Sequence, residues 1–241
     1  MLTRLLPLAL LTACSAASAQ PAQLQTRIEA LAAAGNAEAA YHLGMFHHLG
    51  VNGISKNPRK AFQLFEAAAA GGDPLGAYKL GCYYDGQGEG VVADDPALAL
   101  RYKLVAAEAG YALAQHDVAL LFYKRGDAAS ALRWLKAAAD QGDAGSLMAF
   151  ASVNNGAEGV AKNPVATFAY FTLALRRRGV PSSAEQTAWL AEFESRMSAS
   201  AVAEAAKIIA AWSPRPTPLT LKALSGDAAA QALVRSAKAP S

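Results

Sequence analysis

Residues 37–47 read AEAAYHLGMFH, and stretches of the same pattern return three times along the chain. The later stretches are PLGAYKLGCYY at 74–84, ALAQHDVALLF at 112–122 and AGSLMAFASVN at 144–154. When they are aligned, each has a large side chain at the position of Tyr41, a bulky apolar residue two positions later and then a Gly or Ala. Helical periodicity beside a column of small residues predicts helices that approach a neighbouring helix closely.

Each of these stretches is followed by a loop and by a second apolar-periodic stretch that ends in glycine. The second stretches are RKAFQLFEAAAAGG, LALRYKLVAAEAG, SALRWLKAAADQG and TFAYFTLALRRRG. Glycine just after the last periodic residue is typical of a helix end, because glycine adopts the left-handed conformation without steric cost. The sequence therefore predicts about four helix-turn-helix repeats, at residues 37–73, 74–111, 112–143 and 144–180.

The loops of the first and fourth repeats share a motif, GISKNPRKAF at 53–62 and GVAKNPVATF at 159–168. The second helices are expected to begin at Asn57-Pro58, Asp95-Pro96, Asp127 and Asn163-Pro164. Asn or Asp at an N-cap accepts free backbone N–H groups, and proline at the first helical position loses no hydrogen bond. The repeated Lys-Asn-Pro is therefore interpreted as a repeated helix start. The glycine-rich loops also lack the patterns of phosphate-binding loops.

The composition favours an alanine-rich helical protein. Hydrophobic residues make up 53% of the chain and charged residues 17%, below the usual quarter. The net charge of +3 is scattered along the sequence, which argues against a nucleic-acid-binding protein.

Residues 1–19 have the features of an export signal. Arg4 precedes an apolar run, residues 5–11, that is too short to span a bilayer. Cleavage after Ala19 would release a soluble periplasmic protein. However, Leu11-Thr12-Ala13-Cys14 resembles a bacterial lipobox, in which the cysteine is lipidated. The lipoprotein interpretation is preferred because the protein has only two cysteines, and Ser15 then resembles an outer-membrane sorting signal.

The repeats resemble the Sel1-like repeat (SLR), a relative of the tetratricopeptide repeat with the pattern A-x-x-x-L-G-x-x-Y, a glycine-rich loop and K-A-x-x-W/Y-x-x-x-A-A-x-x-G. The residues that carry the resemblance are Leu43-Gly44, Leu80-Gly81, Lys60-Ala61, Ala131, Trp134, Ala138-Ala139 and Gly142. It covers residues 22 to about 212, with Val118-Ala119 and Phe150-Ala151 departing from the usual Leu-Gly. The resemblance implies an all-α fold, a right-handed α/α superhelix (solenoid) whose first helices line a concave face.

Both ends of the repeat array, within residues 20–212, are predicted to be capped by helices. Residues 22–34 form the N-terminal cap, and Ser182-Ser183-Ala184-Glu185 is interpreted as a capping box that opens a helix to about Met197. A further helix is expected at 200–212. Residues 213–241, which begin with a proline-rich break, are interpreted as a weakly ordered helix pair, either a degenerate repeat or a tail.

The sequence shows no pattern for catalysis, a cofactor or a metal site. His47 and His48 project about 100° apart on a helix, and neither His42 nor His116 forms a metal-binding spacing with them. One cysteine-rich branch of the SLR family is associated with penicillin binding and weak β-lactamase activity. Its disulfide in each repeat has no counterpart here, because only Cys82 lies among the repeats.

The resemblance implies a groove for a partner on the concave face. Its expected residues are Tyr41, Met45, His48, Tyr78, Cys82, Asp85, His116, Leu120, Tyr123, Met148, Ser152 and Asn155. Aromatic anchors dominate many binding energies, but the same tyrosine column fits the packing inside each repeat equally well.

The expected function is that of a monomeric, non-enzymatic scaffold in the bacterial envelope that binds a protein or peptide, without cofactors. The alternatives are a hydrolase acting on β-lactams or peptidoglycan and a purely structural envelope protein.

Overall fold

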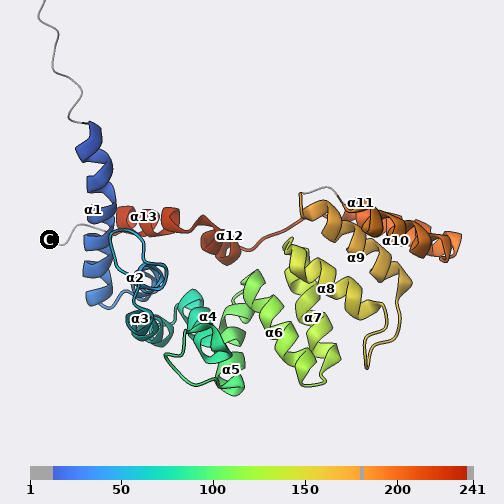
Figure 1. The fold of residues 1–241 in the computed structure, drawn as a ribbon, viewed down its shortest axis with the longest axis horizontal. Coiled ribbons are helices and arrows are strands. Elements are labelled where there is room, and N and C mark those ends of the chain that lie inside the picture. Colours follow the sequence, from blue (N-terminus) through green and yellow to red (C-terminus); the bar gives the residue numbers. More distant parts are fainter. Residues whose placement is uncertain (1–12, 180–181, 238–241) are drawn as a thin grey trace, which may run out of the picture. The chain divides into compact units, whose positions relative to one another are not determined.

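The computed structural model describes residues 13–179 and 182–237, and in these residues it contains helices and loops but no strands (Figure 1). The all-α fold predicted from the sequence is confirmed. The protein divides into two compact units. Unit 1 comprises Met1–Asp95 with Ser225–Ser241, and unit 2 comprises Pro96–Leu224. In each unit, consecutive helices pack against one another as helix pairs, the arrangement of a solenoid.

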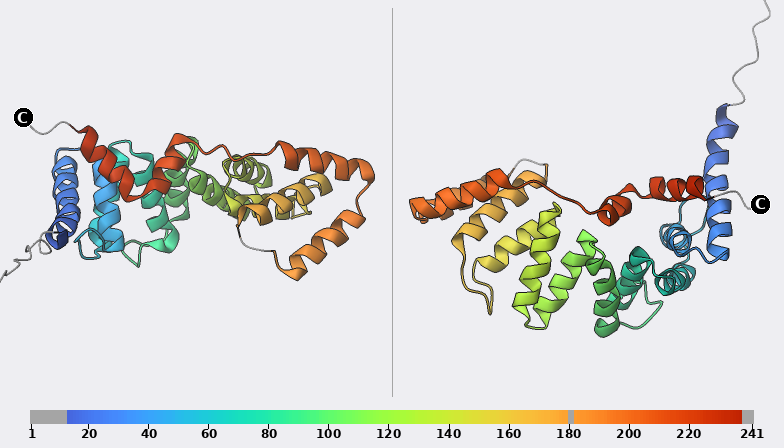
Figure 2. Two further views of the ribbon diagram at one scale, coloured as in Figure 1. Left: turned by 90° about the horizontal axis from the view of Figure 1, so that it is seen from above. Right: turned by 180° about the vertical axis from the view of Figure 1, so that it is seen from behind.

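Unit 1 contains the first repeat and most of the second. Its elements are α1 (Ala13–Ala33), α2 (Ala37–Leu49), α3 (Pro58–Ala70), α4 (Pro74–Cys82), the wide helical turn η1 (Tyr83–Gln87) and α13 (Asp227–Ser236). The predicted N-terminal helix begins earlier than expected, at Ala13 instead of 22. In both views of Figure 2, α13 lies beside α1. Ile28 and Val234 are buried in their shared core, and Arg27 donates a hydrogen bond to the Val234 carbonyl.

Unit 2 contains the remaining repeats and a helical cap. Its helices are α5 (Pro96–Glu108), α6 (Ala112–Lys124), α7 (Ala128–Asp140), α8 (Ala144–Asn154), α9 (Pro164–Arg177), α10 (Ala184–Ser195), α11 (Ala199–Ala211) and α12 (Pro218–Ser225). The core of the fourth repeat includes Leu147, Tyr170 and Leu173, and α11 closes it with Ala205. Burial of these apolar side chains is the main source of stability in such a core of packed helices.

The second helices start where the sequence predicts. The Asn57 and Asn163 side chains each accept a hydrogen bond from a backbone N–H, that of Lys60 and Ala166 respectively, at 3.0 Å. Asp127 does the same with the Ser130 N–H at 2.9 Å. The interpretation of these residues as N-caps is therefore confirmed.

The capping box of α10 lies one residue later than predicted. The Ser183 hydroxyl accepts from the Gln186 N–H, and the Gln186 side chain accepts from the Ser183 N–H. Ser182 and Glu185 do not form the box. The sequence fits both registers, because either serine is followed three residues later by a long polar side chain.

Residues 214–220, called the strap below, bind the turns between the repeats of unit 2. The strap's Thr217 hydroxyl donates to the Gly110 carbonyl at 2.8 Å, and its Thr220 hydroxyl donates to Gln141 Oε1 at 2.6 Å. The backbone N–H of Arg215 donates to the Asp140 carbonyl. A segment expected to begin a weakly ordered helix pair is thus held by specific polar contacts.

Candidate functional site

Three residues expected to be exposed in the groove of unit 1 are buried. Tyr41, Tyr78 and Cys82 are 9%, 6% and 3% exposed. Tyr41 packs beside Phe65 of α3, with ring centroids 6.4 Å apart, and the thiol of Cys82 is buried. The tyrosine column therefore fills the space between first and second helices, which corrects the expected exposure of these three residues.

The other three groove residues expected in unit 1 are half-buried: Met45, His48 and Asp85. His48 Nδ1 lies 3.1 Å from the Tyr83 hydroxyl. Burial, together with the positive charge of Lys79, lowers the pKa of His48 below its ordinary value of 6.5. Burial and the nearby Glu89 raise the pKa of Tyr83 to about 12. Both groups therefore stay neutral near pH 7, which suits an internal contact.

In unit 2, helix α6 presents two of the expected residues as exposed large side chains. Leu120 is 42% and Tyr123 is 39% exposed, and Leu113, on the same face of the helix, is 41% exposed. These three residues are called the α6 face below. His116 lies between them and is held by Ser146 of α8, with His116 Nδ1 2.8 Å from Ser146 Oγ. The α6 face is an apolar surface beside a fixed polar side chain.

On α8, the expected groove residues are of mixed exposure. Met148 is half-buried and packs against the core of the fourth repeat. Ser152 and Asn155 are exposed, and the Ser152 hydroxyl donates to the Met148 carbonyl. Asn155 is the residue that follows the last turn of α8.

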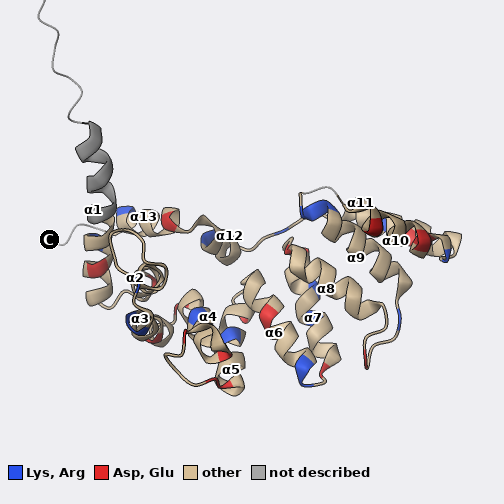
Figure 3. Cartoon of the chain, in the orientation of Figure 1, with Lys and Arg blue, Asp and Glu red and all other residues tan. Residues whose placement is uncertain are grey.

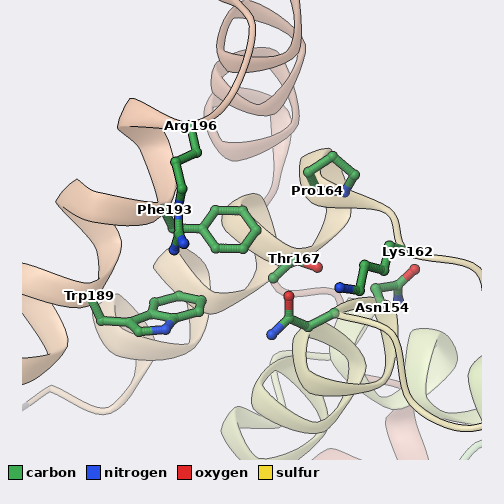
Figure 4. Close-up of a pocket in the computed structure, with 8 residues that line it drawn as sticks. Asn154, Lys162, Pro164, Thr167, Trp189, Phe193 and Arg196 are labelled. Atoms are coloured by element: carbon green, nitrogen blue, oxygen red, sulfur yellow. The ribbon is translucent and has the colours of Figure 1, made fainter.

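Asn155 also lines a cavity of about 390 Å³ at the end of the fourth repeat, shown in Figure 4. The lining residues are Asn154, Asn155, Lys162, Pro164, Thr167, Trp189, Phe193 and Arg196, and this cavity is called the aromatic–cationic pocket. Two of them are cations, two are aromatic and none is acidic. The pocket combines positive charge with apolar ring surface.

The local structure accounts for the positions of these side chains. Gly156 has φ +102°, and the aliphatic stem of Lys162 lies so close to it that a β-carbon there would be 2.7 Å from Lys162 Cε. The cap helix α10 supplies the rings: Trp189 contacts Phe193 and Phe171, with centroid distances of 5.0 and 4.6 Å. In Figure 4 the Lys162 ammonium points toward Thr167 and the interior of the pocket.

A second cavity of about 520 Å³ adjoins this one and is called the apolar pocket. It shares Asn154, Lys162 and Pro164 with the first, and its remaining lining includes Leu132 and Val160. The Lys-Asn-Pro segment thus separates a cationic, aromatic cavity from an aliphatic one.

The sequence-based reasoning missed the residues that α10 contributes to the pocket. Trp189, Phe193 and Arg196 are spaced four and three residues apart, which places them on one face of a helix. That spacing was visible in the sequence. What it did not show was that this face meets the loop of the fourth repeat.

Residues 13–179 and 182–237 contain no cluster of ligands for a metal ion, and no helix there has the length and hydropathy needed to cross a bilayer. Basic and acidic residues are interspersed along the helices of each unit (Figure 3). The export signal expected at residues 1–19 lies mostly outside the described residues, as does the Cys14 side chain.

The sequence profile of the Sel1 repeat family matches residues 37–73, 74–111, 112–143 and 147–177. Among curated proteins no significant relative is found.

Two solved structures show a similar fold. The first is a protective antigen of uropathogenic Escherichia coli with an SLR fold, with 20% identity and a TM-score of 0.60. That similarity covers 89% of this protein but only 43% of the antigen. The second is a Sel1 repeat protein from Oxalobacter formigenes, with 22% identity, a TM-score of 0.54 and coverage of 68% of this protein and 74% of the other.

Proposed function

Because the chain belongs to the Sel1 repeat family, whose members generally mediate protein–protein interactions, we propose that it is a non-catalytic scaffold whose α6 face binds a protein partner. The observation that carries this proposal is the exposure of Leu113, Leu120 and Tyr123 on one side of α6. Large apolar and aromatic side chains that stay exposed together typically mark interaction sites.

The strap supports the proposal, because it is an intramolecular example of peptide binding by these repeats. Gly110 and Gln141, in the turns between repeats, hold the hydroxyl groups of Thr217 and Thr220. The Gln141 side chain also accepts from the Thr217 backbone N–H at 3.0 Å. Side chains and turn carbonyls of unit 2 can thus satisfy both the main chain and the side chains of an extended segment.

A crosslinking pulldown from bacterial envelope fractions tests the α6 face. The double variant Leu120→Ala/Tyr123→Ala should lose partners that the wild-type protein recovers. Val105→Ala is the matched control, because Val105 is 45% exposed but lies on α5, a second helix. Equal recovery by the double variant and the wild type would contradict the proposal.

The proposed location is the bacterial envelope, through a lipid on Cys14. Support comes from the lipobox-like residues 11–14 that follow the basic and apolar start of the sequence. Cys14→Ala should move the protein from the membrane fraction to the soluble periplasm, because a protein with diacyl modification is stably anchored whereas an unmodified one is not. Unchanged fractionation would contradict lipidation, and a wild-type protein that is already in the soluble periplasm would favour cleavage after Ala19.

A further inference from the structure

We propose that the aromatic–cationic pocket and the apolar pocket together bind a short peptide segment in which a carboxylate lies next to apolar side chains. This site shares no residue with the α6 face. The inference therefore goes beyond the function proposed above, and either can fail alone.

Charge complementarity identifies the carboxylate. Lys162 and Arg196 line the aromatic–cationic pocket, which contains no acidic residue. Among the described residues no carboxylate forms an ion pair with Lys162. Within residues 13–179 and 182–237, Arg196 pairs only with Glu192 in the last turn of α10, at 3.6 Å, with both side chains more than 60% exposed. Exposed pairs of this kind contribute little, so Arg196 can turn to a ligand at small cost.

The aromatic side chains select an apolar neighbour for that carboxylate. Trp189 and Phe193 are half-buried, and Pro164 lies across the pocket from them in Figure 4. Rings in a partly enclosed cavity gain from covering an aliphatic or aromatic side chain, and Trp is among the residues that most often anchor an interface. An anion without an apolar part would leave this surface uncovered.

The size and continuity of the two cavities indicate a peptide instead of a small anion. They measure about 390 and 520 Å³ and share Asn154, Lys162 and Pro164. Ligand cavities of about 300–1,000 Å³ typically hold molecules much larger than acetate. Lys162 lines both cavities, so an acid bound to its ammonium brings the residues on either side of that acid close to one cavity each. Ala128, Leu132 and Val160 offer an aliphatic lining for the second side chain.

The side chain of Lys162 is exposed, but its aliphatic stem packs against the backbone before any ligand arrives. Its stem covers Gly156, whose missing side chain leaves the room, so the ammonium has fewer conformations to lose on binding. The polar side chain of Asn155 is exposed at the rim of the same pocket, where it can bond to the main chain of a peptide.

The test measures peptide binding to the purified full-length protein by fluorescence anisotropy. The probe is an equimolar pool of fluorescein-labelled Gly-Z-Asp-Z-Gly amides, in which Z is Leu, Val, Phe or Trp. A second pool has Asn in place of Asp, and a third is the Asn pool with a free C-terminal carboxylate. The variants are Lys162→Met, which keeps the stem over Gly156, and Arg196→Gln. Lys56→Met, in the matching loop of the first repeat, is the control.

The Asp pool should bind at least about tenfold more tightly than the Asn amide pool, a difference of about 1.4 kcal/mol. Lys162→Met and Arg196→Gln should each abolish most of that difference, and Lys56→Met should leave it unchanged. Added salt should weaken binding. If only the free-acid pool binds, and Lys162→Met weakens it, the pocket recognises the C-terminal carboxylate of a peptide, and the chemistry proposed here still holds.

Two results would overturn the proposal: no saturable binding of the Asp and free-acid pools, or equal binding by wild type and both pocket variants. Circular dichroism spectra of the variants show whether a loss of binding reflects unfolding. Because Arg196 is exposed, Arg196→Gln remains informative if Lys162→Met is poorly folded. The pulldown with Leu120→Ala/Tyr123→Ala is read separately, so its outcome does not decide this one.

Discussion

The loops that precede α3 and α9 have nearly the same backbone but different surroundings. In each, the N-cap Asn donates its backbone N–H to a carbonyl at the end of the first helix, Asn57 to His47 at 2.7 Å and Asn163 to Asn154 at 2.8 Å. In each, a lysine lies over a glycine with positive φ. Lys56, however, forms an ion pair with Glu89, whereas Lys162 lines a cavity without acidic residues.

The same helix-start motif therefore occurs in two different environments. The Lys-Asn-Pro backbone is set by the requirements of capping and of a tight turn, which are local and therefore repeat with the sequence. The environment of the lysine is set by whatever element packs next. In the first repeat this is the loop that carries Glu89, and in the fourth it is the cap helix α10.

The largest effect is expected where the first helices of these two repeats approach their neighbours. Gly44→Ala should lower the free energy of unfolding by about 1–3 kcal/mol, because the new β-carbon would lie 2.7 Å from the ring of Phe65, which is fully buried. The better helix propensity of alanine, about 1 kcal/mol, offsets part of this cost. Urea denaturation measures the change.

The matched substitution in the fourth repeat is Ala151→Gly, since Ala151 occupies the equivalent position and is buried. It should cost about 1 kcal/mol, mainly through helix propensity. A neutral or stabilising Gly44→Ala would show that Phe65 can move aside, and that the two repeats do not differ in this packing.

The next effect concerns the shared part of the loops. Asn57→Ala and Asn163→Ala should each lower the free energy of unfolding by about 1 kcal/mol, because each removes one N-cap acceptor. Asn→Asp at the same positions is the control and should preserve stability, since the carboxylate also caps. If the two alanine variants lost strongly unequal amounts of unfolding free energy, the two loops would not be equivalent.

The shared part of the loops could be predicted from the sequence, and the differing part could not. Asn57, Asn163 and the glycines after each helix act through neighbours within a few residues, so the pattern itself indicates their role. The environment of the Lys162 side chain depends on Trp189 and Phe193, which follow it by more than twenty residues. Nothing in the spacing states which face of a cap helix meets which loop.

The residues expected in the groove also divide into those whose environment the sequence predicts and those whose environment it does not. Tyr41 and Tyr78 recur because they fill the space between two helices of one repeat, and the structure buries both. Leu120 and Tyr123 occupy the same helical face in a later repeat but stay exposed. Repetition alone therefore identified the packing positions better than the accessible ones.

A smaller effect should distinguish what Lys56 and Lys162 contribute to the free energy of unfolding. Lys56→Met should lower the free energy of unfolding by up to about 1 kcal/mol, the range for ion pairs whose side chains are half exposed, as those of Lys56 and Glu89 are. Lys162→Met should leave stability unchanged, because no ion pair with a described carboxylate is lost. Glu89→Gln should reproduce the Lys56→Met result. A larger loss for Lys162→Met than for Lys56→Met would mean that the pocket lysine is structural.

The smallest effect is a pH dependence confined to the first repeat. His47 and His48 precede its loop, whereas Asn154 and Asn155 precede the loop of the fourth repeat. Burial is the main cause that lowers the pKa of both histidines below 6.5, and Lys60 and Lys79 respectively add to it. The folded protein therefore binds fewer protons than the unfolded protein just below pH 6.5, and the free energy of unfolding should fall as the pH drops through that value.

Replacing both histidines with asparagine, as in the fourth repeat, should remove this contribution to the pH dependence. Urea denaturation of the wild type and of His47→Asn/His48→Asn between about pH 7.5 and 5.5 makes the comparison, because the carboxylates that titrate at lower pH are common to both proteins. If the difference in unfolding free energy between them stays constant over that range, the histidines are as solvated in the folded protein as in the unfolded one. The loop of the first repeat would then be no more enclosed at its histidine end than the loop of the fourth.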